Sequence, residues 1–160
     1  MAGGSSRGCE GGPPTVVGVH RFASILLVDA RGWVLLQERD EFPVIDPEKW
    51  GMVGGHLDEG EEFEEAAYRE LAEETGLVLP PGALTAWREF DVVHTAYGSV
   101  DRMAVFAAAT DLTDDDIVVG EGRQIVFVDP DVARALALTE SATIVLPAFL
   151  DSALYASMAP

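Results

Sequence analysis

The chain has 160 residues, of which ten are basic and 28 acidic, so its formal net charge is −18. The length and an apolar fraction of 48% fit one domain with a sizeable core. Such a charge disfavours nucleic acid and anionic membrane as partners, since both are bound through clustered Lys and Arg. No apolar run reaches the ~18 residues of a membrane span, and no secretory signal is evident. With Cys9 as the sole cysteine, we expect a cytoplasmic protein without disulfides.

The N-terminal residues 1–14 are rich in Gly, Ser and Pro, which predicts a disordered tail ahead of one domain over residues 15–160. Two β-branched and apolar runs, 21–29 and 33–38, enclose Ala30-Arg31-Gly32 and predict a β-hairpin with a three-residue loop. Residues 40–49 follow as an exposed loop, because they combine two prolines with several charges. The chain then enters a short strand, 50–53, which runs into Gly54-Gly55.

A helix is predicted from Glu62 to Thr75. Asp58 to Glu61 has the pattern of an N-terminal capping motif with Asp58 as the cap. Phe63, Ala67 and Leu71 recur every four residues and predict the buried stripe. Gly76 ends the helix, and two prolines that follow at 80 and 81 prevent its continuation.

The remainder of the chain alternates strands and helices in an irregular order, which favours a mixed α/β layer fold. We expect strands at 84–94 and 102–109 joined by a turn at Tyr97-Gly98, an acidic connector at 111–116, a strand at 124–128, a helix from Pro130 to Leu136, and a helix over 140–155 that is capped by Thr139 and either kinked or broken at Pro147.

Three glutamates of the predicted helix, Glu70, Glu73 and Glu74, share one face of its last turns. Their charges repel one another at these spacings, and they face the negative end of the helix dipole. A helix shaped for stability alone would carry Lys or Arg there. The pattern therefore predicts a cation between the carboxylates, and oxygen ligands favour a hard divalent ion.

The same stretch resembles the Nudix family. Gly55 is followed after five residues by Glu61 and after seven more by Arg69-Glu70-Leu71-Ala72-Glu73-Glu74-Thr75-Gly76-Leu77, which reproduces a complete Nudix box without a gap. Asp58 stands where members often have Glu, outside the fixed positions. The resemblance implies an α/β/α sandwich with a mixed sheet, and hydrolysis of a nucleoside diphosphate linked to another moiety with Mg²⁺ or Mn²⁺.

The resemblance also implies roles for single residues. Glu73 and Glu74 would be metal ligands, and Glu70 would either be a ligand or act as the base toward the attacking water. Arg69 would orient Glu70 and Glu73, and Gly55 would offer a backbone carbonyl near a metal. For the further acid that many members take from a later loop, the candidate is Glu121, with Asp114 to Asp116 as the weaker alternative. The box acid at the helix start, Glu61, would play a supporting part.

Outside these residues the sequence is less specific. His56 lies in the box loop and Arg39 ends a strand that should flank the site, so both are candidates for substrate binding. His20 and His94 lie in strand-like segments and are interpreted as structural or surface groups. Several aromatic residues could stack on a base, although core packing is the more common role: Phe22, Phe42, Trp50, Trp87 and Tyr97.

The resulting functional hypothesis is a Mg²⁺-dependent pyrophosphohydrolase. Because marks of other subfamilies are missing, a MutT-like enzyme acting on a (d)NTP is favoured, with nucleotide-sugars or other NDP-linked compounds next. A nucleotide-sensing domain without turnover is the alternative from another class, although sensors usually lose box acids and none is lost here. RNA decapping is disfavoured by the lack of basic surface. Isoprenoid diphosphate isomerisation is disfavoured because Cys9 lies in the tail. A homodimer is open, as many relatives form one.

Overall fold

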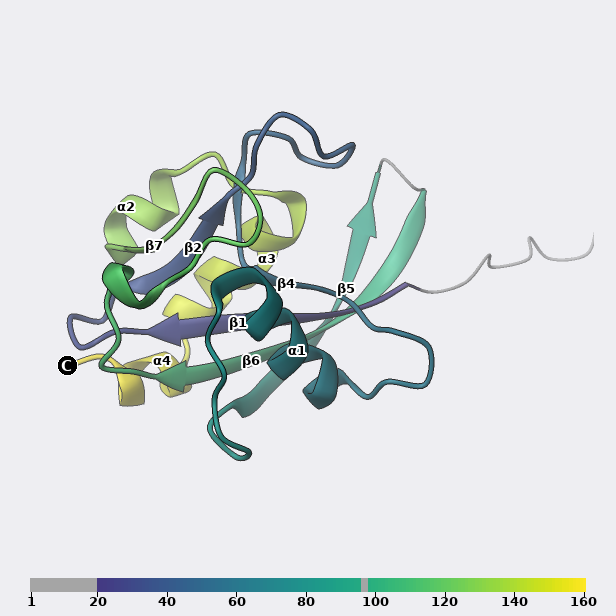
Figure 1. Ribbon diagram of the computed structural model, residues 1–160. Coiled ribbons are helices and arrows are strands. Elements are labelled where there is room, and N and C mark those ends of the chain that lie inside the picture. Colours follow the sequence, from purple (N-terminus) through teal and green to yellow (C-terminus); the bar gives the residue numbers. More distant parts are fainter. Residues whose placement is uncertain (1–19, 96–97) are drawn as a thin grey trace, which may run out of the picture.

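The computed structural model describes residues 20–95 and 98–160 (Figure 1). In chain order its elements are β1 (Arg21–Val28), β2 (Val34–Glu38), β3 (Trp50–Gly51), β4 (Val53–His56), α1 (Phe63–Thr75), β5 (Thr85–His94), β6 (Ser99–Ala109), the 3-10 turn η1 (Asp114–Asp116), β7 (Gln124–Val128), α2 (Pro130–Ala135), α3 (Glu140–Leu150) and α4 (Ala153–Met158). Across these two ranges, no helix has the combination of length and apolar character that crossing a membrane requires.

Strand β1 is the centre of a mixed seven-stranded sheet, because it has partners on both sides. Along its whole length it pairs in parallel with β6, which in turn pairs antiparallel with β5. On its other side, its first half pairs antiparallel with β4, starting at Phe22↔His56, and its last residue meets β2 at Val28↔Val34. Strand β2 then diverges from β1 and pairs with β3 and β7.

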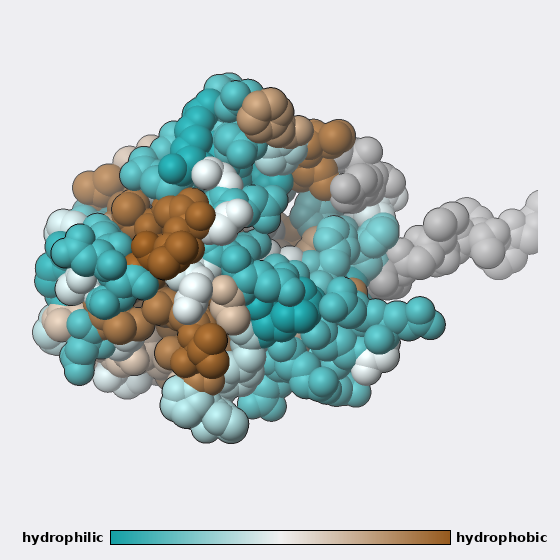
Figure 2. Space-filling view, viewed as in Figure 1, coloured by the Kyte–Doolittle hydropathy of each residue, from teal (hydrophilic) through white to brown (hydrophobic). Residues whose placement is uncertain are grey.

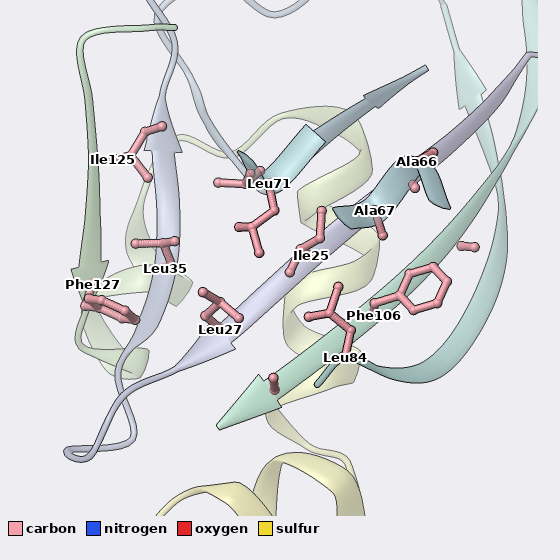
Figure 3. Packing of buried hydrophobic residues seen from close by; sticks show 14 residues of the cluster. Ile25, Leu27, Leu35, Ala66, Ala67, Leu71, Leu84, Phe106, Ile125 and Phe127 are labelled. Carbon is pink, nitrogen blue, oxygen red and sulfur yellow. The ribbon is translucent and has the colours of Figure 1, made fainter. Parts of the chain in front are cut away.

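The apolar residues of β1 alternate between two cores, one on each face of the sheet. Ile25 and Leu27 join the cluster that α1 completes with Leu71, and Figure 3 shows these side chains together. Leu26 and Val28 point to the opposite cluster, which α3 covers with Phe149 among others. Because β1 is buried on both faces, it reads as a continuous apolar run and not as an alternating one. The predicted α/β/α sandwich with a mixed sheet is confirmed, with α1 on one face and α3 on the other (Figure 1).

Two predicted elements differ from the structure in instructive ways. The single strand expected at 50–53 is two strands, β3 and β4, separated at Met52. The chain leaves β2 and moves to β1 at this residue, because the two central strands have already parted. The helix expected over 140–155 does not break at Pro147, which lies inside α3. It ends at Leu150 instead, where the side chain of Ser152 accepts the N–H of Tyr155 and begins α4.

The predicted capping role of Asp58 is wrong. Helix α1 begins at Phe63 with Glu62 at the N-cap position, and no side chain caps it. Asp58 instead closes a turn, donating its N–H to the side chain of Glu61 at 3.0 Å. The predicted end is confirmed, since Gly76 has φ +73° and donates its N–H to the carbonyl of Ala72. The expected tail at 1–14 and residue Tyr97 lie outside the described residues.

Candidate active site

Two glycines of β4 bring the carboxylates of α1 against the sheet. A Cβ on Gly54 would lie 2.1 Å from the carbonyl oxygen of Ala23, and one on Gly55 would lie 2.6 Å from Oε1 of Glu70. Gly54 also has φ +151°, a conformation that L-residues rarely adopt. Any side chain at either position would displace β1 or Glu70. The glycines therefore create the space that the carboxylates fill.

Glu74 is the most unusual carboxylate of the site, because it is only 6% exposed. Its Oε2 accepts one hydrogen bond, from the Gly54 N–H at 3.1 Å. Burial raises the pKa of Glu74 to about 8, and the nearby carboxylates of Glu70 and Glu121 act in the same direction. Burial likewise raises the pKa of Glu70. The protein therefore does not supply enough positive charge or hydrogen bonds to stabilise the ionised forms of Glu70 and Glu74.

Arg69 donates hydrogen bonds to four residues through one planar guanidinium group. Its Nε and Nη2 donate to the two carboxylate oxygens of Glu61, each at 2.8 Å, and Nη2 also donates to the His56 carbonyl at 3.0 Å. Its Nη1 donates to Glu70 at 2.9 Å and to Glu73 at 3.1 Å. The hydrogen bonds from Arg69 lower the pKa of Glu61 to about 2. Arg69 therefore holds Glu70 and Glu73 relative to the β4 backbone.

The loop that precedes β7 runs along the C-terminal end of α1 and brings Glu121 to the site. The Val118 N–H donates to the carbonyl of Thr75 at 2.9 Å, and the Gly120 N–H donates to that of Glu74 at 2.8 Å. These bonds satisfy carbonyls that the last turn of a helix otherwise leaves without partners. Gly120 is required here, since a Cβ would lie 2.3 Å from the carbonyl oxygen of Glu73.

A cleft of about 530 Å³ opens beside these carboxylates, a size typical of small-molecule sites. Glu70, Glu74, Glu121 and Gly55 all line it, together with Arg39 and His56, the two predicted substrate-binding residues. Glu73 is not among the lining residues; its side chain is 59% exposed and turned to Arg69. Figure 2 shows a hydrophilic surface over α1, with apolar patches beside it on the same face.

Arg39 is the only arginine or lysine among the described residues that line this cleft. Its Nη2 donates to the carbonyl of Ile45 at 3.2 Å, while its Nε is buried without a hydrogen-bond partner in the described part of the chain. A buried, unsatisfied donor of a cationic group is costly. As the one cationic side chain on the described lining of the cleft, Arg39 is suited to bind an anionic group there.

The structure separates the two candidates for the additional loop acid. Glu121 lies beside Glu70 and Glu74, and its backbone carbonyl accepts a hydrogen bond from Gln37 Nε2 at 2.9 Å. Asp114 instead accepts the Phe127 N–H at 2.8 Å, and Asp116 accepts the Thr113 N–H at 2.8 Å. Both aspartates accept backbone N–H groups, and none of Asp114 to Asp116 lines the cleft, so the weaker alternative is not brought to it.

Some residues of the cleft were missed by sequence reasoning. Gln37 is a buried polar residue on β2 that positions the Glu121 loop, and His94 is a buried histidine on β5 that lines the cleft. No local pattern marks either of them. Gln37 could have been noticed as the one amide in an apolar strand, whereas the role of His94 depends on strands far apart in the sequence.

The donor set suits a hard divalent cation, although it is not pre-assembled. No three acidic, histidine or cysteine side chains of residues 20–95 and 98–160 stand together as a formed metal site. The carboxylates have other hydrogen-bond donors instead: Arg69 donates to Glu70 and Glu73, and the Gly54 N–H donates to Glu74. Carboxylate oxygens without a compensating cation, at the edge of a cleft, nevertheless fit Mg²⁺ or Mn²⁺ in their chemistry.

Comparison with known proteins identifies the family. Residues 18–149 match the profile described as NUDIX domain. This stretch covers most of the chain and includes β1 to nearly the end of α3. The chain therefore belongs to the Nudix family, and the resemblance stated from the box residues is confirmed.

Individual relatives share part or most of this domain. The m7GpppN-mRNA hydrolase NUDT17 of Bos taurus is 35% identical over 85 residues, which are 53% of this chain and 28% of that protein. The chain thus spans about a quarter of that relative's length. The putative 8-oxo-dGTP diphosphatase of Bacillus subtilis is 30% identical over 118 residues, 71% of this chain and 75% of that protein.

Among solved structures, the MutT NUDIX hydrolase from Burkholderia pseudomallei superposes with a TM-score of 0.66 at 24% identity, covering 82% of this chain and 98% of that one. At this identity the likeness shows the fold alone.

Proposed function

We propose that this chain is a divalent-cation-dependent pyrophosphohydrolase that cleaves the diphosphate linkage of a small nucleotide. The observation that carries the proposal is the convergence of Glu70, Glu74 and Glu121 on one cleft of nucleotide size. A carboxylate as buried as Glu74, with its pKa raised to about 8, is typical of groups that act at a site and not of groups that stabilise a fold.

The proposed cation is Mg²⁺ or Mn²⁺, and the proposed ligands are Glu70, Glu73, Glu74, Glu121 and the Gly55 carbonyl. When bound, such an ion bridges phosphate oxygens and neutralises the charge that develops in displacement at phosphorus. It would also let a chain of charge −18 hold a polyanion. Glu73 would reach this site by exchanging its hydrogen bond with Arg69 for the cation, since its side chain is 59% exposed.

The protein residues would divide the remaining work. Arg69 would hold Glu70 in place through its hydrogen bond at 2.9 Å. Glu70 would ligate the cation or accept the proton of the attacking water; Glu73 is the other catalytic candidate. Arg39 would contact a phosphate of the substrate, because it is the only Arg or Lys on the described lining of the cleft. His56 would contact the substrate from the β4 end, where its ring is exposed.

For the substrate we propose a (d)NTP, cleaved to a nucleoside monophosphate and pyrophosphate. The support is the relative named a putative 8-oxo-dGTP diphosphatase, which the chain covers over 75% of its length. The relative named for an mRNA cap makes capped RNA a second candidate. The net charge of −18 argues against a long polyanion, because such binding relies on clustered Lys and Arg. Nucleotide-sugars remain an alternative of the small-molecule kind.

A nucleotide sensor without turnover is the alternative from another class. The retained carboxylates at 70, 73 and 74 argue against it, since a sensor has no need of them. A cytoplasmic location and a homodimer, which subcellular fractionation and light scattering would test, belong to the same proposal.

The deciding experiment is a panel of nucleotides incubated with the protein and Mg²⁺ or Mn²⁺ in ¹⁸O-labelled water. We expect metal-dependent release of a nucleoside monophosphate, and mass spectrometry of the products identifies the phosphorus that was attacked. The panel should contain (d)NTPs, nucleotide-sugars and a capped oligonucleotide. Absence of turnover for every compound, together with a melting temperature raised by one of them, would instead support the sensor.

A further inference from the structure

A buried histidine and a buried aspartate meet at one end of the cleft. His94, the last residue of β5, is 7% exposed and lines the cleft. Its Nδ1 forms a short hydrogen bond with Oδ2 of Asp101 on β6, whose side chain is fully buried. Asp101 also accepts the backbone N–H of His20 at 3.3 Å. The aspartate therefore holds the imidazole ring in one orientation.

This arrangement leaves one polar atom of the His94 ring for a ligand. Within the described residues, Nε2 has no hydrogen-bond partner, and it is not among the polar atoms that are buried without one. The small exposed part of His94 thus includes this nitrogen, at the wall of the cleft. Fold stability alone does not explain the His94–Asp101 pair, because replacing a buried charged pair by apolar residues of similar volume often leaves a protein equally stable.

The surroundings of His94 suit a flat aromatic ligand. The ring of Phe22 lies 5.4 Å from that of His94 and 4.0 Å from that of His56, measured between centroids. Met103, paired with Phe22 across β1 and β6, lines the same part of the cleft. Aromatic and thioether side chains offer a stacking surface, and His94 adds one polar contact beside it.

The position along the sheet separates this end of the cleft from the carboxylates. Gly54, which hydrogen-bonds Glu74, is paired with Ser24, whereas His56 is paired with Phe22 two residues further along the ladder. Two strand residues span about 7 Å. A nucleotide with its phosphates at Glu74 would place its sugar across this interval and its base at Phe22.

The charge of the pair argues for a base and against a phosphate. Asp101 lies directly behind His94, so the two side chains carry no net positive charge whether or not the imidazole is protonated. A phosphate would find its counter-charge at Arg39 and the cation site instead.

We propose that His94 is a specificity-determining residue, whose Nε2 hydrogen-bonds the edge of a nucleobase that stacks on Phe22, and that Asp101 is the positioning residue behind it. The inference rests on the proposed function in one respect, the placement of the phosphates at the carboxylates. The ligand it assigns is the heterocyclic base of a nucleotide, recognised by one hydrogen bond and one aromatic face.

The test measures binding and therefore does not depend on turnover. Titration calorimetry with Mg²⁺ compares α,β-methylene nucleoside triphosphates of the four common bases with tripolyphosphate, which has no base. We expect the wild type to bind at least one nucleotide more tightly than tripolyphosphate. His94→Ala should weaken that nucleotide roughly tenfold, the loss of about one hydrogen bond, and leave tripolyphosphate unchanged.

Val93→Ala is the matched control. Val93 neighbours His94, is 56% exposed and points to the opposite face of β5, so its truncation should change neither affinity. The proposal is overturned if His94→Ala weakens both ligands alike or neither, or if the wild type binds no nucleotide more tightly than tripolyphosphate. The hydrolysis panel on the wild type judges the proposed function separately.

A second measurement covers the case in which His94→Ala does not fold. The chain has only three histidines, so the ¹⁵N spectrum of histidine-labelled wild type contains three imidazoles that single substitutions can assign. Addition of the tightest nucleotide analogue should shift the Nε2 resonance of His94, whereas tripolyphosphate should leave it in place. An unmoved Nε2 resonance at saturation with the nucleotide overturns the proposal.

Discussion

Glu74 shows at the scale of one residue how the site opposes the stability of the fold. Its carboxylate is buried, accepts a single backbone N–H at 3.1 Å, and has the carboxylates of Glu70 and Glu121 nearby. Ionisation of such a group is unfavourable unless a cation arrives. A bound metal ion is therefore expected to supply the positive charge that stabilises the ionised form of Glu74.

Glu74→Gln should lower turnover by orders of magnitude and leave the fold intact. Gln keeps an oxygen that can accept the Gly54 N–H, but it loses the charge proposed to ligate the cation. Turnover would be measured on the best substrate of the panel, with circular dichroism and the melting temperature as controls for folding. Near-wild-type activity in this variant would sink the assignment.

The metal-free protein should lose stability as the pH rises, and Glu74 should be a main cause. Its pKa is about 8 in the folded chain against an ordinary value of 4.5 for a glutamate side chain, so the folded state binds the proton more tightly. The contribution is fully present below pH 4.5 and is lost as the pH rises through 8. Urea unfolding in EDTA at pH 5 and pH 9 gives the free energy of unfolding at each pH. Between these two values it should fall by roughly 2–4 kcal/mol more in the wild type than in Glu74→Gln. Equal falls would contradict the raised pKa.

At the scale of elements, the C-terminal half of helix α1 is positioned by glycines of two different segments, β4 and the loop before β7. Gly54 and Gly55 allow its acidic face to approach β4, and Gly120 allows the loop before β7 to approach its last turn. The loop donates two N–H groups to the C-terminal carbonyls of α1 and in doing so places Glu121. The negative end of the helix is thus satisfied by backbone, because its side chains are acidic.

Gly120→Ala should destabilise the fold and disturb the site together. The new Cβ would lie 2.3 Å from the carbonyl oxygen of Glu73, which is backbone and cannot swing away. We expect a loss of about 1–3 kcal/mol of unfolding free energy and weaker metal binding, because the loop that carries Glu121 must move.

Val119→Ala is the control in the same loop, since Val119 is 45% exposed and its truncation leaves the backbone unchanged. It should alter stability by less than about 0.5 kcal/mol. A Gly120→Ala protein as stable as this control would show that the loop is not held against α1 as described.

At the scale of the whole molecule, a net charge of −18 must be reconciled with an anionic substrate. Arg39 is the only Arg or Lys on the described lining of the cleft, while Arg102, Arg123 and Arg134 are paired with surface carboxylates. The positive charge that a diphosphate requires must then come mainly from bound cations. The proposed function therefore depends on a bound cation and not on a basic surface patch.

Divalent cations should raise the melting temperature of the wild type. Binding to the folded state alone stabilises it by mass action, and here it also relieves repulsion among the carboxylates. Calorimetric scans at millimolar Mg²⁺ or Mn²⁺ should show a shift that NaCl of equal ionic strength does not reproduce. Glu65→Gln, on an exposed part of α1, should keep the shift, and Glu74→Gln should lose it. An unchanged wild-type melting temperature would count against the site.

The sequence alone determined the family, the sandwich and most of the element boundaries. The box from Gly55 to Leu77 carries these inferences because its chemistry is local: a glycine entry, a helix and acids spaced by one helical period. The strand over 124–128 was predicted to the residue, since its apolar run ends at Asp129-Pro130, which begins the next helix.

Only the tertiary structure decided which distant residues join the site. It brought Glu121 to the cleft and left Asp114 bonded to the backbone of β7, a distinction that acidic composition alone does not predict. It also turned His94, expected to be structural or on the surface, into a cleft residue held by Asp101. Such choices depend on the pairing of β1, β5 and β6, whose partners are far apart along the chain. Local patterns specify the helix that carries the carboxylates, whereas long-range strand pairing specifies what faces them.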